Sequence, residues 1–150
     1  MSRLDFYHLQ STDLDHTLPL LAEKAYKLNK NIIIKIGTAE RVPYINTLLW
    51  TYRDDAFLPH GSSSDGNASL QPIWLTSQDD NPNNASLLFL VDGADYEVSK
   101  LAEFERVFYI FDGNDVQMLQ QARDFWKSAK ALEMDCFYWQ QDTSGHWQQK

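Results

Sequence analysis

The 150-residue sequence contains one cysteine, Cys136, and no apolar run as long as the roughly 18 residues of a membrane-spanning helix. A single cysteine excludes an intramolecular disulfide framework and a metal site built from several thiolates. The first ten residues lack the apolar segment of a secretion signal. We therefore expect a cytoplasmic protein that contacts no membrane, with Cys136 as a core residue.

Basic residues are also scarce: 13 lysines and arginines stand against 21 acidic residues, which gives a net charge of -8. A chain with this charge has no broad attraction for the nucleic-acid backbone, so we expect no direct nucleic-acid partner. An anionic partner must use a local basic patch instead. The hydrophobic content of 43% and the charged content of 23% predict one globular domain over residues 1–150.

The familiar catalytic motifs are missing. There is no glycine-rich dinucleotide or phosphate loop, no H-E-x-x-H zinc motif and no G-x-S-x-G nucleophile motif. The histidines are scattered, without the spacing of metal ligands. His60 is expected to hold its loop by a hydrogen bond. These absences predict no catalytic residue, no bound metal and no cofactor.

The first half of the chain alternates strands and helices. Residues 3–9 read as a strand, and apolar residues from Leu14 to Leu28 follow at helical spacing. The run NIIIKI at 31–36 predicts a buried strand, after which Thr38 is expected to cap a helix that continues to about Tyr52. Residues 54–69 are rich in Asp, Ser, Gly and Asn and predict a long surface loop.

The second half repeats a strand-turn-helix pattern. Strands are expected at 72–76 and 87–91, and the segments LLFLVDGADY and VFYIFDGNDV each predict a strand, an Asp-Gly turn and a helical segment. The second of these helices is expected over residues 115–133, followed by the aromatic strand MDCFYWQQ and by GHWQQ as a tail or a last strand. The class is α/β: a single domain with a mostly parallel central sheet flanked by helices, Rossmann-like without a phosphate-binding loop.

Four aspartates follow the two repeated strands, where open α/β sheets place their ligands: Asp92, Asp95, Asp112 and Asp115. Such carboxylates could hold magnesium for a phosphohydrolase. A structural role is the favoured interpretation, because Asp-Gly suits a tight turn and Asp115 suits a helix cap.

The helix expected at 115–133 has two contrasting faces. At about 100° per residue, one face collects apolar side chains, namely Met118, Phe125, Ala129 and Leu132. The opposite face collects three cations within about 60°, with one indole at the seam: Arg123, Lys127, Lys130 and Trp126. A solvated face explains many such stripes. The alternative is a site for an acidic, partly hydrophobic peptide or for single-stranded nucleic acid.

Two further rings are candidates for the wall of a pocket beside this basic helix. Trp50 ends the second expected helix, and Phe57 stands in the polar loop. Large rings at such places often remain partly exposed, although either could pack inward.

Several short motifs together resemble a known family. They are F-Y-x-L at 6–9, L-W ending at Trp50, F-L-P-H-G at 57–61, Q-P-I-W-L at 71–75, F-D-G at 111–113, A-R-x-x-W-K at 122–127 and G-x-W at 145–147. Over nearly its whole length, the chain resembles the chi subunit of bacterial DNA polymerase III. The resemblance implies a non-enzymatic accessory subunit of the clamp-loader complex.

The resemblance also implies partners and site residues. Chi proteins bind the psi subunit and, separately, the acidic C-terminal tail of single-stranded DNA-binding protein, which ends in a Pro-Phe carboxylate. Carried over to this chain, the tail-binding pattern falls on Arg123, Lys127 and Lys130, with Trp126 at a commonly aromatic position. Trp50 and Phe57 match positions linked to partner contacts, including those of a helicase-like repair protein that competes with psi. Leu119 departs from the pattern, because some relatives carry another cation there.

Overall fold

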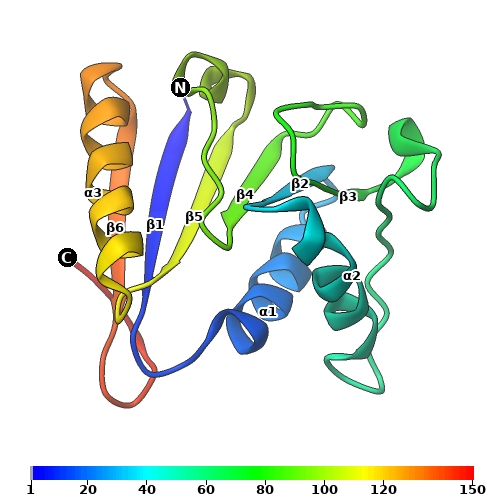
Figure 1. Cartoon of the computed structure of the whole chain (residues 1–150), viewed down its shortest axis with the longest axis horizontal. Helices are drawn as coiled ribbons and strands as arrows, with labels where there is room; N and C mark the ends of the chain where they lie inside the picture. Colours follow the sequence, from blue (N-terminus) through cyan, green and yellow to red (C-terminus); the bar gives the residue numbers. More distant parts are fainter. Residues whose placement is uncertain (1) are drawn as a thin grey trace.

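The computed structural model describes residues 2–150 (Figure 1). Seven strands form one sheet in the order β3-β2-β4-β5-β1-β6-β7, and all neighbours are parallel except β6 and β7. The strands are β1 (Arg3–Leu9), β2 (Ile32–Ile36), β3 (Ile73–Thr76), β4 (Leu87–Val91), β5 (Arg106–Asp112), β6 (Asp135–Gln141) and β7 (Trp147–Gln149). The helices are α1 (Leu14–Tyr26), α2 (Val42–Thr51) and α3 (Val116–Ala131), with 3-10 turns η1 (Ala39–Arg41), η2 (Ala68–Leu70) and η3 (Val98–Glu103). The α/β class with a mostly parallel sheet is confirmed.

The central strands are apolar because both sides of them are covered. In β2 the three consecutive isoleucines Ile32, Ile33 and Ile34 are fully buried, and every residue of β4 is buried. Such continuous apolar runs are typical of parallel strands with helices or loops on both faces. Within residues 2–150, no helix has the length and the apolar character needed to cross a membrane.

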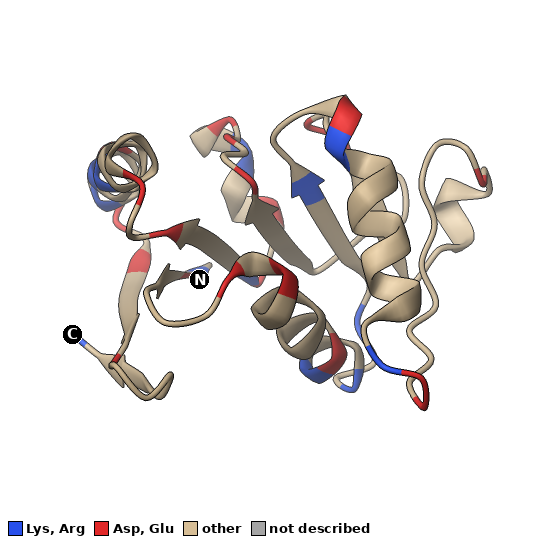
Figure 2. Cartoon of the chain, turned by 60° about the horizontal axis from the view of Figure 1, so that its bottom comes forward, with Lys and Arg blue, Asp and Glu red and all other residues tan. Residues whose placement is uncertain are grey.

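The sheet separates two hydrophobic cores. One contains Leu18 and Ala22 of α1 together with Ile45 and Leu49 of α2. The other contains Phe125 of α3 and lies on the opposite face. Figure 2 shows α3 on one side of the sheet and α1 on the other. The candidate sites on α3 and on α2 are therefore separated by the thickness of the sheet.

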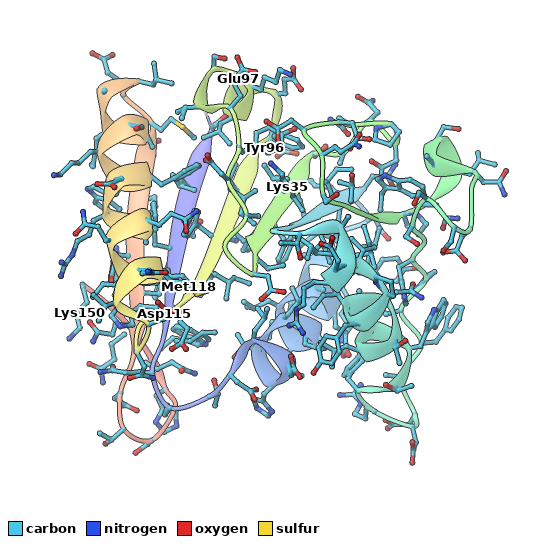
Figure 3. The ribbon with its side chains drawn as sticks, viewed as in Figure 1. Lys35, Tyr96, Glu97, Asp115, Met118 and Lys150 are labelled. Atoms are coloured by element: carbon cyan, nitrogen blue, oxygen red, sulfur yellow. The ribbon has the colours of Figure 1, made fainter. Side chains whose placement is uncertain are left out.

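Helix α3 begins at a strong cap. The Asp115 side chain accepts hydrogen bonds from the backbone N–H groups of Gln117 and Met118, at 2.9 and 3.2 Å, which confirms its expected capping role. Figure 3 labels Asp115 and Met118 at this end of α3. Phe125 and Ala129 face the core as predicted, whereas Leu132 is 54% exposed because the helix ends at Ala131.

Replacing this cap gives a first test of the fold. The change Asp115→Ala removes an acceptor from two otherwise orphaned N–H groups, so we expect it to destabilise the protein by about 1 kcal/mol. Thermal unfolding followed by circular dichroism measures this loss of stability, which corresponds to a fall in Tm of roughly 3 °C. The control is Asp124→Ala at an exposed position within α3, where a change under about 0.5 kcal/mol is expected. Equal losses in both variants would contradict the capping role.

Two expected helices differ from prediction. The helical segment expected after LLFLVDGADY is the six-residue 3-10 helix η3, whereas the one expected after VFYIFDGNDV is the α-helix α3. Thr38 makes no side-chain cap, and α2 begins at Val42 after the 3-10 turn η1. Pro43 at the second position of α2 needs no backbone hydrogen bond there, so the regular helix starts beside it.

The loop at 54–69 is anchored at its centre. Leu58 and His60 are buried, and the two ring nitrogens of His60 lie 2.6 Å from the Leu58 carbonyl oxygen and 3.0 Å from that of Asn46. Gly61 then forms a parallel bridge with Trp74 of β3. His60 thus orders the loop, as expected.

Candidate functional site

An apolar cavity of about 280 Å³ lies on the outer side of α3. Its lining comes from α3 and from one residue of β6: Leu119, Ala122, Arg123, Trp126, Lys127 and Tyr138. The first four α3 positions follow the spacing i, i+3, i+4 and i+7, which places them on one face of a helix. The cavity lies between this face of α3 and the Tyr138 side chain of β6, the strand that pairs with β1.

The Trp126 ring packs against two aromatic side chains of the sheet, Phe6 and Tyr138. Its centroid lies 5.1 Å from that of Phe6 and 6.0 Å from that of Tyr138, and Tyr138 meets it edge-on. Edge-on and tilted packing at these distances stabilises aromatic pairs. Trp126 is half-buried, at the seam predicted for it. One face of a fixed indole is therefore available as the wall of the cavity.

Three cations surround this wall. Arg123, Lys127 and Lys130 are exposed, and the Lys130 Nζ lies 5.4 Å from the centre of the Trp126 ring. Among residues 2–150, none of the three has a carboxylate within 4.0 Å. Figure 2, which looks nearly along the axis of α3, shows the blue of lysine and arginine on one side of this helix. An apolar cavity bordered by unpaired cations is suited to a ligand with a hydrophobic end and a carboxylate.

Two titratable side chains near the cavity, His8 and Tyr138, are neutral near pH 7. Burial lowers the pKa of His8, an effect that Asp112 opposes and Arg123 reinforces. Burial raises the pKa of Tyr138, and the charge of Arg123 partly offsets this. His8 and Tyr138 are joined by a hydrogen bond of 2.6 Å between the imidazole Nδ1 and the phenol oxygen. The positive charge at the cavity thus comes from Arg123, Lys127 and Lys130.

Trp50 and Phe57 do not line this cavity, which corrects the expectation of a shared pocket. Their ring centroids are 5.8 Å apart, and Trp50 also packs against His60 at 4.0 Å. Trp50 is 44% exposed and Phe57 is 75% exposed. They form a separate aromatic patch, here called the α2 patch, because α2 covers the β3 side of the sheet on the face opposite to α3.

The strand-end aspartates do not converge on a metal site. Three of them line a crevice of about 390 Å³, but each has a structural partner: Asp92 pairs with Arg41 at 2.5 Å, Asp112 accepts from the Asn114 N–H, and Asp115 caps α3. Asp95 lies outside the crevice lining. Residues 2–150 contain no group of three or more carboxylate, histidine or cysteine side chains placed to hold a metal ion. Asp92, Asp112 and Asp115 therefore serve an ion pair, a turn and a helix cap.

Comparison with known proteins identifies the family. The family described as "DNA polymerase III chi subunit, HolC" matches residues 1–136. The chain belongs to this family. It is also similar to the "Probable DNA polymerase III subunit chi" of Rickettsia prowazekii (strain Madrid E), with 32% identity over 109 residues. That match covers 72% of this chain and 66% of the relative, slightly less than two thirds of the relative's length.

The chi-family match includes all of α3 but stops within β6. Tyr138, which closes the cavity, therefore lies beyond the matched residues, and sequence reasoning did not name it. A signal was present in the aromatic run of β6, where alternate residues point to opposite faces. The alternation points to Tyr138 only when the position of β6, beside β1 and beneath α3, is known. Cys136 of this strand is half-buried, and burial raises its pKa, so it has no activated thiolate.

Proposed function

We propose that this chi-family chain is a non-catalytic accessory subunit of the bacterial DNA polymerase III clamp-loader complex. In this proposal the α3 cavity binds the acidic C-terminal tail of single-stranded DNA-binding protein. The observation that carries the proposal is the apolar cavity of about 280 Å³ bordered by three cations that have no carboxylate partner within residues 2–150. Such a site matches the two features of the tail, a terminal Phe and a row of carboxylates.

Each part of the cavity has a role in binding. The terminal Phe ring enters the cavity and packs on the side chains of Trp126 and Tyr138, and its burial contributes about 1.5 to 3 kcal/mol. Arg123 receives the terminal carboxylate, because a guanidinium can donate two parallel hydrogen bonds to it. Lys127 and Lys130 attract the acidic residues that precede the Phe, and salt weakens this attraction. The apolar contact gives specificity, and the cations give orientation.

We assign the α2 patch to a second protein partner. The exposed rings of Trp50 and Phe57 stand together on a surface remote from α3, so a second protein can bind there while a tail occupies the cavity. Aromatic residues of this kind are enriched in binding hot spots. The proposed partner is the psi subunit or a helicase-like repair protein that competes with it.

This arrangement makes the chain a tether. DNA coated with single-stranded DNA-binding protein offers many tails, so a weak contact at α3 becomes effective through multivalency and still exchanges quickly. The net charge of -8 disfavours direct contact between the body of the protein and DNA.

A fluorescence-anisotropy titration tests the tail site. We expect a labelled acidic peptide ending in Pro-Phe to bind with a dissociation constant on the order of micromolar, weakened by salt. The matched controls are the same peptide without its Phe and the same peptide with an amidated C-terminus, both of which should bind much more weakly. A labelled single-stranded oligonucleotide is the third comparison. Tight binding of the oligonucleotide alone would replace the proposal with direct nucleic-acid binding.

A further inference from the structure

A second apolar groove, of about 440 Å³, lies on the sheet face opposite to α3. Its floor consists of aromatic side chains from adjacent strands, Tyr7 of β1, Phe108 of β5 and Trp139 of β6. One wall is α1, and the other is Trp147 of β7, whose ring meets Tyr7 edge-on at 5.1 Å. We call this feature the α1 groove.

The wall formed by α1 has the pattern of a helix-packing face. Its lining residues Leu21, Lys24 and Ala25 are spaced i, i+3 and i+4 in α1, and Leu28, in the turn that follows the helix, extends the same wall and is 54% exposed. Helices that pack side by side use such a stripe, with axes about 8 to 10 Å apart, and a small residue in the stripe permits close approach. Ala25 is that small residue. No helix within residues 2–150 occupies the position beside this stripe.

The two faces of β5 and β6 differ in how they are covered. Helix α3 packs over β5 and β6 on the opposite face. On the groove face, Trp139 and Trp147 remain only half-buried. Sheets of this class bury their apolar faces under helices. At the α1 groove, residues 2–150 therefore supply a floor and one neighbouring helix but no covering helix.

The charged side chains that line the groove, Lys24 and Arg106, are both positive. Arg106 donates from Nε to Asp5 at 2.8 Å and from Nη2 to the Tyr7 hydroxyl at 3.1 Å. Asp5 is shared with Arg3, which binds it through two hydrogen bonds of 2.9 Å, so one carboxylate serves two guanidinium groups. The Arg106 Nη1 has no protein partner within residues 2–150. The groove thus keeps positive charge in a protein of net charge -8.

We propose that the α1 groove binds an amphipathic helix of a partner protein whose apolar stripe is bordered by acidic side chains. The stripe on α1 and the aromatic floor fit the apolar side of such a helix, and Lys24 and Arg106 fit carboxylates at its border. Charge complementarity favours this occupant over a basic helix, and the acidic body of the protein disfavours nucleic acid. The site is independent of the proposed tail site, since the two lie on opposite faces of the sheet.

The five tryptophans allow the test to be done on the intact protein. Each indole N–H gives one resonance in a ¹⁵N-correlated NMR spectrum: Trp50 reports on the α2 patch, Trp74 on the interior, Trp126 on the α3 cavity, and Trp139 and Trp147 on the α1 groove. Single Trp→Phe variants assign the resonances. The probe is a capped synthetic helix with Leu at i, i+3, i+4 and i+7 and Glu at the flanking positions. We expect it to shift the Trp139 and Trp147 resonances saturably and to leave that of Trp126 in place.

Two variants and one matched peptide sharpen the result. Lys24→Glu reverses an exposed charge at the groove, so we expect it to weaken binding of the acidic helix at least fivefold. Lys127→Glu makes the same change at the α3 cavity and should leave this binding within twofold of the parent. The matched peptide carries Lys in place of Glu and should bind at least fivefold more weakly than the acidic helix.

The proposal fails if the acidic helix leaves Trp139 and Trp147 unshifted, or if the basic helix binds equally well. It also fails if an oligonucleotide shifts these two resonances and the acidic helix does not. Shifts of the same resonances that appear on concentrating the protein alone would assign the groove to a second copy of the chain. A failure of the tail titration does not affect these outcomes, because Trp126 reports that site separately.

Discussion

The Asp5→Ala variant is expected to be about 3 kcal/mol less stable than the parent protein. Asp5 is fully buried, and its carboxylate accepts two hydrogen bonds from Arg3, one from Arg106 and one of 2.9 Å from the Trp139 indole. Removing one member of a buried charge network costs about 3 to 5 kcal/mol, because the remaining charges lose their partner. The side chains of Arg3 and Arg106 are 40% and 31% exposed, so water partly compensates and the lower figure applies.

The effect of this change depends on pH in a defined direction. Burial alone raises the pKa of Asp5, but the hydrogen bonds from Arg3 and Trp139 and the charge of Arg106 outweigh it and hold the pKa below the usual 3.8. A carboxyl whose pKa is lower in the folded state stabilises the protein above its unfolded pKa, and this stability is lost as the pH falls through the folded pKa. The difference between variant and parent should therefore be full at neutral pH and shrink below about pH 4.

Urea unfolding at several pH values measures this difference. The control is Glu105→Ala, which removes the carboxylate of the exposed pair with Lys30 and should cost less than about 1 kcal/mol. In thermal unfolding, the Asp5 variant should melt about 10 °C below the parent. A loss in the Asp5 variant no larger than that of the control would contradict the importance of the buried network.

The second large effect concerns binding rather than stability. Arg123→Ala should weaken binding of the acidic Pro-Phe peptide about 10- to 100-fold, because a charge-assisted hydrogen bond to a carboxylate contributes about 1.5 to 3 kcal/mol to the binding free energy. Arg123 is exposed and forms no ion pair within the described residues 2–150, so the circular dichroism spectrum of the variant should match that of the parent. Fluorescence anisotropy with the labelled peptide gives the ratio of dissociation constants.

Two comparisons separate geometry from charge at this position. Arg123→Lys keeps the charge but loses the planar fork, and it should recover only part of the affinity. Lys130→Ala removes a cation that stands beside the Trp126 ring rather than in the cavity lining, so its loss should be smaller, about two- to fivefold. Affinity unchanged by Arg123→Ala would remove this residue from the proposed site.

The sequence predicted those parts of the fold that depend on local patterns. The apolar runs of β2 and β4, the Asp115 cap and the core face around Phe125 all follow from spacing and residue type. The predictions that were wrong depend on chain length and on neighbours. The helical segment after β4 is the 3-10 helix η3 rather than an α-helix, and Leu132 is exposed because α3 ends at Ala131, before the predicted end at 133.

Of the residues that line the α3 cavity, only those on α3 could be predicted from the sequence. The wheel of α3 placed Arg123 and Lys127 beside Trp126, because helix geometry is fixed by sequence spacing. Tyr138 was missed because aromatic residues occupy both faces of β6, so alternation alone does not tell which of them lies under α3. Trp50 was associated with the wrong cavity, since nothing local to α2 indicates which face of the sheet it covers.

Two consecutive residues of β6 line the two binding surfaces, the α3 cavity and the α1 groove. Tyr138 lines the α3 cavity, and its neighbour Trp139 lines the α1 groove, because successive side chains in a strand point to opposite faces. Inserting or deleting one residue in β6 would exchange the two rings between the faces. Point substitutions can therefore alter the two surfaces one at a time, whereas a change in strand length must alter both together, so insertions and deletions in β6 should be tolerated far less than replacements.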